Sequence, residues 1–552
     1  MPHAGFVRSL SAALGALVLL AGGAGHTAAA PEPERPVVET DGGAVRGRTH
    51  GAYRTYEGIP YAAAPTGALR WLPPEPAPRW PGVRDAGAPG PHCVQLPALG
   101  PGGPTGSEDC LHLNVTAPAG GEGVLRPHPR PRPVMVWFHG GGFLNGSGDA
   151  YRPDGLAVRG DTVVVTVNYR LGVFGLFGHP ALGGAPNLSI ADQQAALRWV
   201  RANAARFGGD PGNVTVFGES AGALSVCAHL TSPASAGLFH RAVLQSGSCS
   251  TGMPAGAVLP QEEAYEPFVP ERRTTARGVA AAAALGCGRP TGPEVLACLR
   301  GLDARRLATP ELMRRFSLVS YGNRMLPREP RRALEAGRFH RVPVVQGTNR
   351  DEMRLFIGLT LAEFPVPDEA AYRARLVRSF GDSAAAVEAR YPAAGYPTPA
   401  LAWATALSDA SFTCPALRDG SALARHVPTY GYRFSDPDAP NFTGLPTVPG
   451  FPYGAAHGLE LPSLFTTGAA LTGPQRELSA LMTGYWTRFA RTGTPNAPGS
   501  PDWPRLRTPS GAVLSLAPGA GGVRPVDVRA AHHCDLWASA GAPAEGPPEV
   551  RP

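Results

Sequence analysis

Lysine is absent from this chain of 552 residues, so all 50 of its Lys-or-Arg positions are arginines. The absence excludes the chemistries that need a lysine side chain: Schiff-base and pyridoxal-phosphate catalysis, the phosphate-binding P-loop, and the Ser-x-x-Lys acyl-transfer arrangement. The net charge of +7 is carried by arginines that are scattered along the chain and not interleaved with aromatic residues. We therefore expect no nucleic-acid partner.

Long hydrophobic runs are almost as scarce. The clearest one, residues 10–21, follows a short polar start and precedes the small residues 28–30. This three-part order is typical of a secretory signal peptide, and the run is too short to cross a bilayer. We expect residues 1–30 to be cleaved on export. No later run is long enough for a membrane span, so the mature chain is expected to be soluble, secreted and without an integral membrane segment.

The chain also lacks a C-x-x-C motif, and His532, His533 and Cys534 are consecutive, so they cannot all face one metal ion. We expect no metal site. Export makes disulfides possible, although an even number of cysteines does not fix their connectivity. Two pairs are close in sequence, Cys93 with Cys110 and Cys287 with Cys298. The eight cysteines are residues 93, 110, 227, 249, 287, 298, 414 and 534.

The order of apolar segments predicts an α/β fold. Short β-branched runs bounded by Gly or Pro are typical of buried strands, and an amphipathic helix is predicted at residues 190–207. Strands that alternate with helices indicate a large, central, mostly parallel twisted sheet with helices on both faces. The C-terminal part is predicted to be mainly helical. We expect residues 31–540 to form a single catalytic domain and residues 541–552 a flexible tail. The predicted strands are residues 111–116, 134–139, 162–169, 214–217, 342–346 and 430–434.

The most informative motif is Gly-Glu-Ser-Ala-Gly at residues 218–222, directly after a predicted strand and before an apolar helical run. A serine on a sharp strand-to-helix turn exposes its hydroxyl above the sheet, and the flanking glycines provide the clearance that this turn needs. The motif alone is weak in a chain with 70 glycines. In this context it predicts that Ser220 is a catalytic nucleophile.

A second motif, His-Gly-Gly-Gly-Phe at residues 139–143, follows another predicted strand. Its glycines allow backbone N–H groups to turn toward a substrate oxygen and stabilise the negative charge of a tetrahedral intermediate. The predicted donors are Gly141, Gly142 and Ala221, the residue after the nucleophile. The alternatives are a flexible turn or a phosphate cradle, but the latter would lack its usual lysine.

A base and an acid should follow the serine in the chain. His457 lies in a loop of small residues that can bring an imidazole to the top of the sheet, whereas His229 and His240 are close to the nucleophile's helix and more typical of structural histidines. Asp351 and Glu352 both follow a predicted strand, at the strand end where doubly wound folds build their sites. From the residues alone, either carboxylate is a candidate acid.

Taken together, these motifs resemble the type-B carboxylesterases, the α/β-hydrolase family that includes cholinesterases, bacterial carboxylesterases and some fungal lipases. The matching segments cover nearly the whole mature chain: residues 58–62, 107–111, 139–143, 168–170, 192–193, 207–211, 218–222, 245–247, 351–352, 457–458 and 460–462. The resemblance implies a serine hydrolase that cleaves small-molecule carboxylic esters without a cofactor.

The resemblance also implies roles for individual residues. It makes Glu352 the acid and His457 the base, and it pairs Cys93 with Cys110, Cys287 with Cys298 and Cys414 with Cys534. Cys227 and Cys249 are left over, as buried thiols or a fourth bridge. Two structural ion pairs carry over, Arg70 with Glu108 and Arg170 with Asp192. Met353 departs from the family, which usually has glycine after the catalytic glutamate.

Three alternatives to an ordinary esterase remain. A binding protein on this fold would lack the catalytic serine, which is present here. A lipase of this family carries a long amphipathic lid in the first disulfide loop, but only 16 residues separate Cys93 from Cys110, and residues 98–106 are mostly Gly and Pro. A cholinesterase needs an aromatic ring in that loop to hold a quaternary ammonium, and the loop contains no Trp. We therefore expect short to medium acyl chains, although residues 253–268 offer a lid from elsewhere. The natural ester and the oligomeric state do not follow from the sequence.

Overall fold

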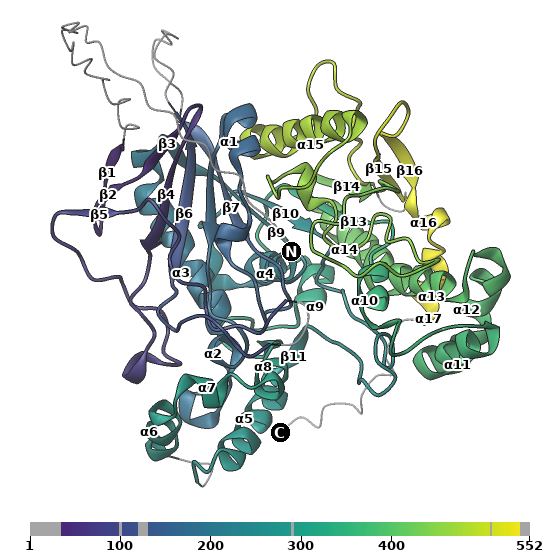
Figure 1. Cartoon of the computed structure of the whole chain (residues 1–552), viewed down its shortest axis with the longest axis horizontal. Coiled ribbons are helices and arrows are strands. Elements are labelled where there is room, and N and C mark those ends of the chain that lie inside the picture. The colour runs from purple at the N-terminus through teal and green to yellow at the C-terminus, as the bar shows by residue number, and fades with distance from the viewer. Residues whose placement is uncertain (1–34, 99–101, 120–130, 289–291, 508–510, 541–552) are drawn as a thin grey trace, which may run out of the picture. The chain divides into compact units, whose positions relative to one another are not determined.

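A mixed sheet of eleven strands runs through the computed structural model, which describes residues 35–98, 102–119, 131–288, 292–507 and 511–540 (Figure 1). The signal peptide and the tail that we predict from the sequence lie outside the described residues. In spatial order the strands are β16 (Arg524–Asp527), β15 (Ala512–Leu516), β14 (Thr429–Phe434), β13 (Val344–Asn349), β10 (Arg241–Gln245), β9 (Gly209–Glu219), β7 (Arg132–Phe138), β8 (Val163–Val167), β6 (His112–Pro118), β4 (Tyr53–Pro60) and β3 (Arg48–His50).

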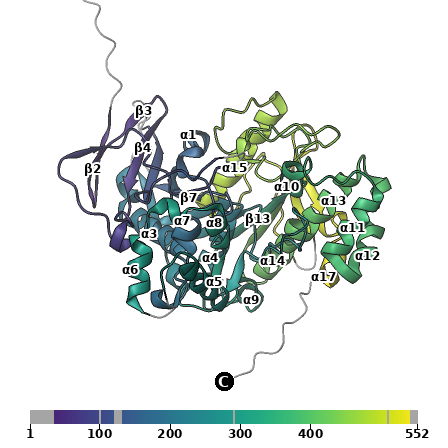
Figure 2. The same ribbon diagram turned by 60° about the horizontal axis from the view of Figure 1, so that its bottom comes forward.

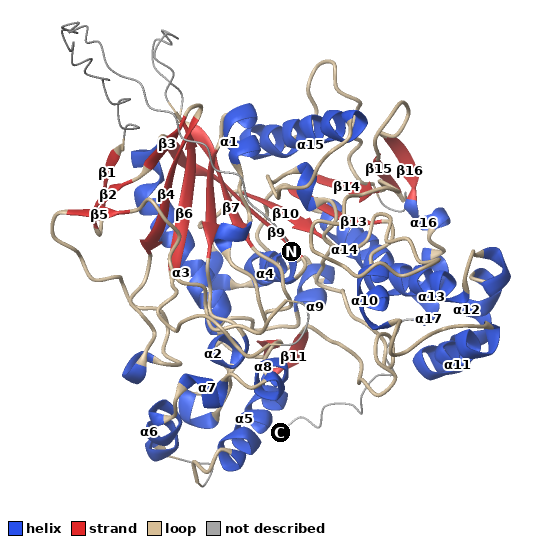
Figure 3. Cartoon of the chain, viewed as in Figure 1, coloured by secondary structure: helices blue, strands red, loops and turns tan. Residues whose placement is uncertain are grey.

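The middle of the sheet, from β15 to β8, is parallel, and the strands at both ends pair in antiparallel fashion. Figure 3 shows the accumulated twist, since β4 and β6 run at a steep angle to β13 and β14 at the other end. This arrangement confirms the predicted α/β fold with a large twisted sheet. Strand β9 differs from the prediction: it begins at Gly209, which lies opposite Arg132 of β7, and a register shift separates this pair from the one at Val134.

Strand β7 illustrates how the sequence builds two cores at once. Val134, Val136 and Phe138 belong to one apolar cluster, and Met135 and Trp137 belong to another. Because successive side chains of a strand point to opposite faces, an uninterrupted apolar run is buried on both sides. The first face packs on α3 (Leu188–Asn203) and α4 (Ala221–Thr231), and the second on α1 (Asp154–Gly160) and α15 (Gly473–Thr492).

Two further groups of helices lie beyond the sheet. Figure 2 shows α5–α8 on one side and α11–α13 on the other. Small sheets join β1 (Val37–Thr40), β2 (Gly43–Arg46) and β5 (Val83–Asp85), and β11 (Phe268–Pro270) with β12 (Val319–Tyr321). The remaining helices are α2 (Gly172–Leu176), α5 (Glu271–Ala284), α6 (Pro293–Gly301), α7 (Ala304–Leu307), α8 (Pro310–Arg315), α9 (Pro330–Glu335), α10 (Met353–Thr360), α11 (Glu369–Phe380), α12 (Ala384–Arg390), α13 (Pro399–Ser408), α14 (Cys414–Ala424), α16 (Val528–Ala531) and α17 (Cys534–Ala540).

Four disulfides tie loops and helices to this frame. The structure joins Cys93 to Cys110, Cys287 to Cys298, Cys414 to Cys534, and also Cys227 to Cys249, the pair that the sequence left open. Cys227 lies on α4 and Cys249 in the loop after β10, so neighbouring parts of the sheet bring them together. A disulfide stabilises mainly by restricting the unfolded chain.

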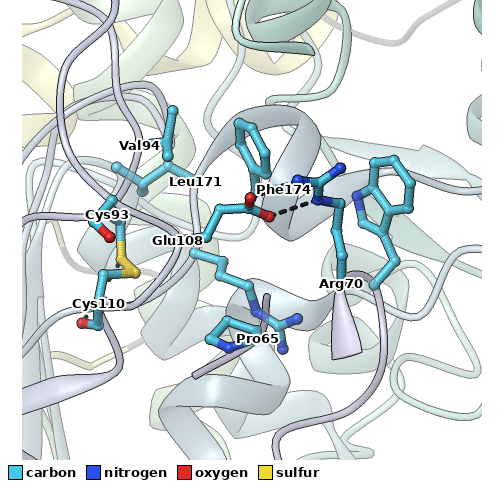
Figure 4. Close-up of a pocket in the computed structure, with 11 residues that line it drawn as sticks. Pro65, Arg70, Cys93, Val94, Glu108, Cys110, Leu171 and Phe174 are labelled. Carbon is cyan, nitrogen blue, oxygen red and sulfur yellow. Dashed lines mark hydrogen bonds and ion pairs between the residues drawn. A yellow bond between two sulfur atoms is a disulfide. The ribbon is translucent and has the colours of Figure 1, made fainter. Parts of the chain in front are cut away.

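The first disulfide loop is also held by an ion pair. Figure 4 shows Arg70 facing Glu108 close to the Cys93–Cys110 bridge. Both guanidinium–carboxylate contacts measure 2.6 Å. The remaining Nη1 of Arg70 donates to main-chain carbonyls in the last turn of α6 and to that of Leu302, just after the helix, at 2.8 Å. A second pair, Arg170 with Asp192, is almost completely buried, with contacts of 2.6 and 2.8 Å. Bidentate geometry of this kind compensates for the cost of burying the charges.

Candidate active site

Ser220 occupies a strained turn between β9 and α4. Its φ is 55° and its ψ is −120°, a conformation that is costly for a residue with a side chain. The turn requires glycine on both sides, because a Cβ at Gly222 would collide with the carbonyl oxygen of Phe138, and one at Gly218 would collide with Gly222. This is the exposed strand-to-helix elbow that the sequence predicts.

The glycine-rich loop after β7 lies beside this elbow. Gly141 and Gly142 both have positive φ, and the N–H groups of Leu144 and Asn145 donate to the carbonyl of Gly141, which closes a tight turn. Gly141, Gly142 and Ala221 line the same cavity as Ser220. Among the described residues, none accepts a hydrogen bond from the N–H groups of these three. They are therefore available to an oxygen atom bound in the cavity.

His457 and Glu352 contact each other directly. Nδ1 of His457 lies 2.7 Å from Oε2 of Glu352, whose Oε1 accepts a hydrogen bond from the N–H of Asn349 at 2.7 Å. Glu352 follows the carboxyl end of β13, and His457 lies in the loop between β14 and α15. The Asn349 side chain donates to the carbonyl of Ala456 at 2.8 Å, so the end of β13, which Glu352 follows, also holds the loop that carries His457.

The neighbouring Asp351 does not contact the imidazole. Its carboxylate accepts the N–H of Ala455 at 3.0 Å and forms ion pairs with Arg350 and Arg354 at 2.7 and 2.9 Å. Asp351 therefore anchors the histidine loop. Met353, where the family usually has glycine, is the first residue of α10 and its N–H donates to Ser408. The departure leaves Glu352 in contact with His457.

Two further carboxylates, which the sequence motifs did not reveal, surround the imidazole. Oε1 of Glu219 lies 3.1 Å from Nε2 of His457, although the two are not aligned as a hydrogen bond. Glu460 is fully buried nearby and is held by Asn349 at 2.7 Å and Gln245 at 3.3 Å. Glu219 immediately precedes the serine and Glu460 follows the histidine by three residues. Their positions beside the motif residues are the only indication that the sequence offers.

The pKa values of His457, Glu219 and Glu460 are all raised. Burial alone would lower the pKa of His457, but the carboxylates of Glu219 and Glu352 outweigh burial and raise it. Burial raises the pKa of Glu219, and the imidazole opposes that shift. His457 therefore holds its proton to a higher pH than a histidine in water does. The rings of Phe356 and Phe412, each 5.1 Å from the imidazole, complete its enclosure.

Ser220 and His457 face one large cavity of about 1610 Å³. No hydrogen bond joins Oγ of Ser220 to Nε2 of His457 within the described residues, and Nε2 is turned toward Glu219. Hydrogen bonds between catalytic groups are commonly long or misaligned before substrate binds. The wall near Ser220 is apolar and includes Leu224, Leu355 and Leu461. The cavity thus combines a serine hydroxyl, an imidazole and free N–H donors with apolar side chains.

Two further histidines, His229 and His240, have structural roles. His229 is buried between the Gln193 side chain at 3.0 Å and Ser235 at 2.9 Å, and burial lowers its pKa to about 3. Nδ1 of His240 accepts the N–H of Val214 at 3.1 Å. Both lie away from the cavity lining. Within the described part of the chain, no three His, Cys, Asp or Glu side chains come together in a way that could hold a metal ion, and no helix is long and apolar enough to span a bilayer.

Known proteins are similar to this chain over most of its length. The profile of the carboxylesterase family matches residues 34–537. The para-nitrobenzyl esterase of Bacillus subtilis is 34% identical over 502 residues, which cover 87% of this chain and 94% of the relative. The cocaine esterase of Oryctolagus cuniculus is 34% identical over 507 residues, covering 85% and 90%. A solved structure titled PNB esterase superposes with a TM-score of 0.71 at 31% identity, covering 91% of this chain and all of that one.

The fold, the elbow and the match over nearly the whole described chain converge on one assignment. The protein belongs to the carboxylesterase family and is a carboxylic-ester hydrolase of the type-B class.

Proposed function

We propose that the enzyme hydrolyses esters through a Ser220–His457–Glu352 triad and a covalent acyl-enzyme. The observation that carries this proposal is the 2.7 Å contact between Nδ1 of His457 and the buried carboxylate of Glu352. That contact fixes the imidazole so that Nε2 is the nitrogen left to act as base.

The proposed reaction has two halves. His457 removes the proton of Ser220 as its oxygen attacks the ester carbonyl, and the N–H groups of Gly141, Gly142 and Ala221 hold the oxygen that becomes negative. The ester C–O bond then breaks and His457 gives its proton to the departing alcohol. Water attacks the acyl-enzyme in the same way, which releases the acid and restores Ser220. Glu352 stabilises the imidazolium in both halves.

The proposal includes a preference for acyl chains of short to medium length. The basis is the first disulfide loop, whose 16 intervening residues are too few and too rich in Gly and Pro for an amphipathic lid. The other lid candidate, residues 253–268, is pinned to the rest of the chain. Its Ala257 carbonyl accepts from the Trp403 indole at 3.2 Å, and its Ala255 carbonyl accepts from Ser379 at 2.7 Å.

We also propose that the mature enzyme is secreted. The four disulfides support export, because such bonds persist in oxidising compartments and are rare in the cytosol. The apolar run at residues 10–21 is the hydrophobic part of the signal peptide that would direct this export.

A panel of p-nitrophenyl esters from acetate to palmitate tests the function. We expect turnover of the short and medium esters, falling toward palmitate, and none of these activities in Ser220→Ala. A folded Ser220→Ala variant with wild-type turnover would overturn the triad, and a palmitate optimum would make the enzyme a lipase.

A further inference from the structure

Four arginines line the cavity that holds Ser220. Arg273 and Arg277 come from α5, and Arg314 and Arg315 come from the end of α8. Glutamates line the same cavity, and its other lining residues include leucine and phenylalanine side chains. The cavity volume of about 1610 Å³ exceeds that of ordinary small-molecule pockets, so a substrate has room to reach from one wall to the other.

Two of the four arginines already have acidic partners. Arg273 lies 3.4 Å from both Glu263 and Glu266, and Arg315 lies 2.6 Å from Glu311. These glutamate side chains also line the cavity, but they are 85%, 55% and 74% exposed, respectively, so water screens their charges. Exposed pairs of this kind contribute little free energy and leave the guanidinium groups open to competition from a better-placed anion.

The other two arginines have no acidic partner. Among the described residues, no carboxylate lies within ion-pair distance of Arg277 or Arg314. The side chain of Arg277 has one acceptor, the main-chain carbonyl of Arg315 at the long distance of 3.4 Å, although a guanidinium offers five N–H donors. Arg277 is half-buried and Arg314 is exposed, so both keep N–H donors that a ligand in the cavity can reach.

The electrostatic surroundings of Arg277 are unfavourable to its charge. Burial lowers its pKa, the like charge of Arg273 lowers it further, Glu263 opposes this shift and Arg315 adds to it. Glu262 also lines the cavity but is not among the charges that act on Arg277. An anion bound at this place would relieve the repulsion and fill the empty donor positions.

We propose that Arg277 and Arg314 form a carboxylate subsite, and that the preferred substrates are esters that carry a second, ionised carboxylate some distance from the ester bond. The planar guanidinium matches a carboxylate in a two-point contact, which fixes direction as well as charge. The inference rests on the proposed function, since the subsite acts by orienting an ester toward Ser220. Arg277 and Arg314 are specificity residues and take no part in bond breaking.

The test compares charged esters with neutral esters of the same length. Monoethyl glutarate, adipate and suberate are paired with the ethyl esters of the unsubstituted acids of equal chain length, and ethanol release gives kcat/KM for each. We expect at least one monoethyl ester to exceed its neutral partner. Arg277→Gln and Arg314→Gln should each lower kcat/KM on that ester by about tenfold and change it on the neutral partner by less than about twofold. The loss should shrink in high salt.

Arg272→Gln is the matched control, because Arg272 is an exposed arginine on the same helix and is not part of the cavity lining. It should leave both substrates unchanged. Free adipate provides a readout without turnover: it should inhibit neutral-ester hydrolysis competitively in the wild type and more weakly in Arg277→Gln. The inference is overturned if neutral esters are preferred at every length, or if Arg277→Gln lowers both series equally while remaining folded. Failure of the triad would appear separately, as neutral-ester turnover that survives Ser220→Ala.

Discussion

Oε1 of Glu219 lies 3.1 Å from Nε2 of His457, at the opposite side of the imidazole from the Glu352 contact at 2.7 Å. One histidine therefore lies between two buried carboxylates, one at the end of β9 and one just after β13. The arrangement stabilises the imidazolium that forms during each half of the proposed reaction. The same carboxylates raise the pKa of His457, so the free enzyme keeps this imidazole protonated to a higher pH than an ordinary histidine.

The first prediction concerns that proton. A base must be neutral to act, and the pKa of His457 is raised, so kcat/KM should fall as the pH drops through a value above the ordinary 6.5 of histidine. Glu219→Gln removes a carboxylate that raises this pKa. The acid limb of the profile should then move to lower pH by about one unit. Glu369→Gln, an exposed change on α11, is the control and should leave the limb in place. An unmoved limb in Glu219→Gln would show that Glu219 does not act on the base.

The second prediction separates the adjacent acids. Glu352→Gln should lower kcat by a factor of about 10² to 10⁴, because the imidazole loses the group that fixes its tautomer and stabilises its charge. Asp351→Asn should mainly destabilise the fold, by about 1 to 3 kcal/mol, because it weakens the anchor of the histidine loop. Steady-state kinetics and thermal unfolding of both variants distinguish these roles. A larger loss of kcat in Asp351→Asn than in Glu352→Gln would reverse the assignment.

The third prediction concerns the cysteines. Peptide mapping of the unreduced enzyme should recover four bridges, Cys93–Cys110, Cys227–Cys249, Cys287–Cys298 and Cys414–Cys534, with no free thiol. Each of the first three closes a loop of roughly 10 to 20 residues and should contribute about 2 to 4 kcal/mol to stability. Reduced thiols at these positions in protein recovered from the culture medium would contradict the pairing.

The fourth prediction concerns the absent lid. Residues 253–268 are tied down by hydrogen bonds from Trp403 and Ser379, so the cavity should be open to soluble esters at all times. The rate on tributyrin should follow ordinary saturation and show no jump when the substrate exceeds its solubility limit. A sharp rise above that limit would identify an interfacial lid and hence a lipase.

The sequence predicted those features whose causes are local. The elbow at Ser220 depends on glycines two residues away on either side, and the apolar run of β7 is buried whichever helices cover it. The features that the sequence did not predict depend on contacts between segments that are far apart in the chain. Glu460 approaches the base only because Asn349 of β13 binds it. Cys227 and Cys249 pair only because β9 and β10 are neighbours.

Two parts of the sheet were not predicted, because turn-forming residues lie within or beside their strands. Gly209, Pro211 and Gly212 read as the end of a helix and not as the start of β9, yet pairing with β7 overrides their low strand propensity. Strands β15 and β16 were missed because Gly and Pro surround and interrupt them. β16 contains Pro525 and tolerates it as the terminal strand of the sheet, where its outer edge makes no ladder.

The central claim, that Ser220 is the residue that becomes acylated, is tested most directly by a covalent trap. The enzyme is treated with an organophosphate ester, which phosphorylates activated serines, and the modified peptide is identified by mass spectrometry. The account predicts one phosphoryl group per chain, on Ser220, with loss of esterase activity in proportion to labelling, and no labelling of Ser220→Ala. Stoichiometric labelling of another residue, or full activity in the labelled enzyme, would contradict it.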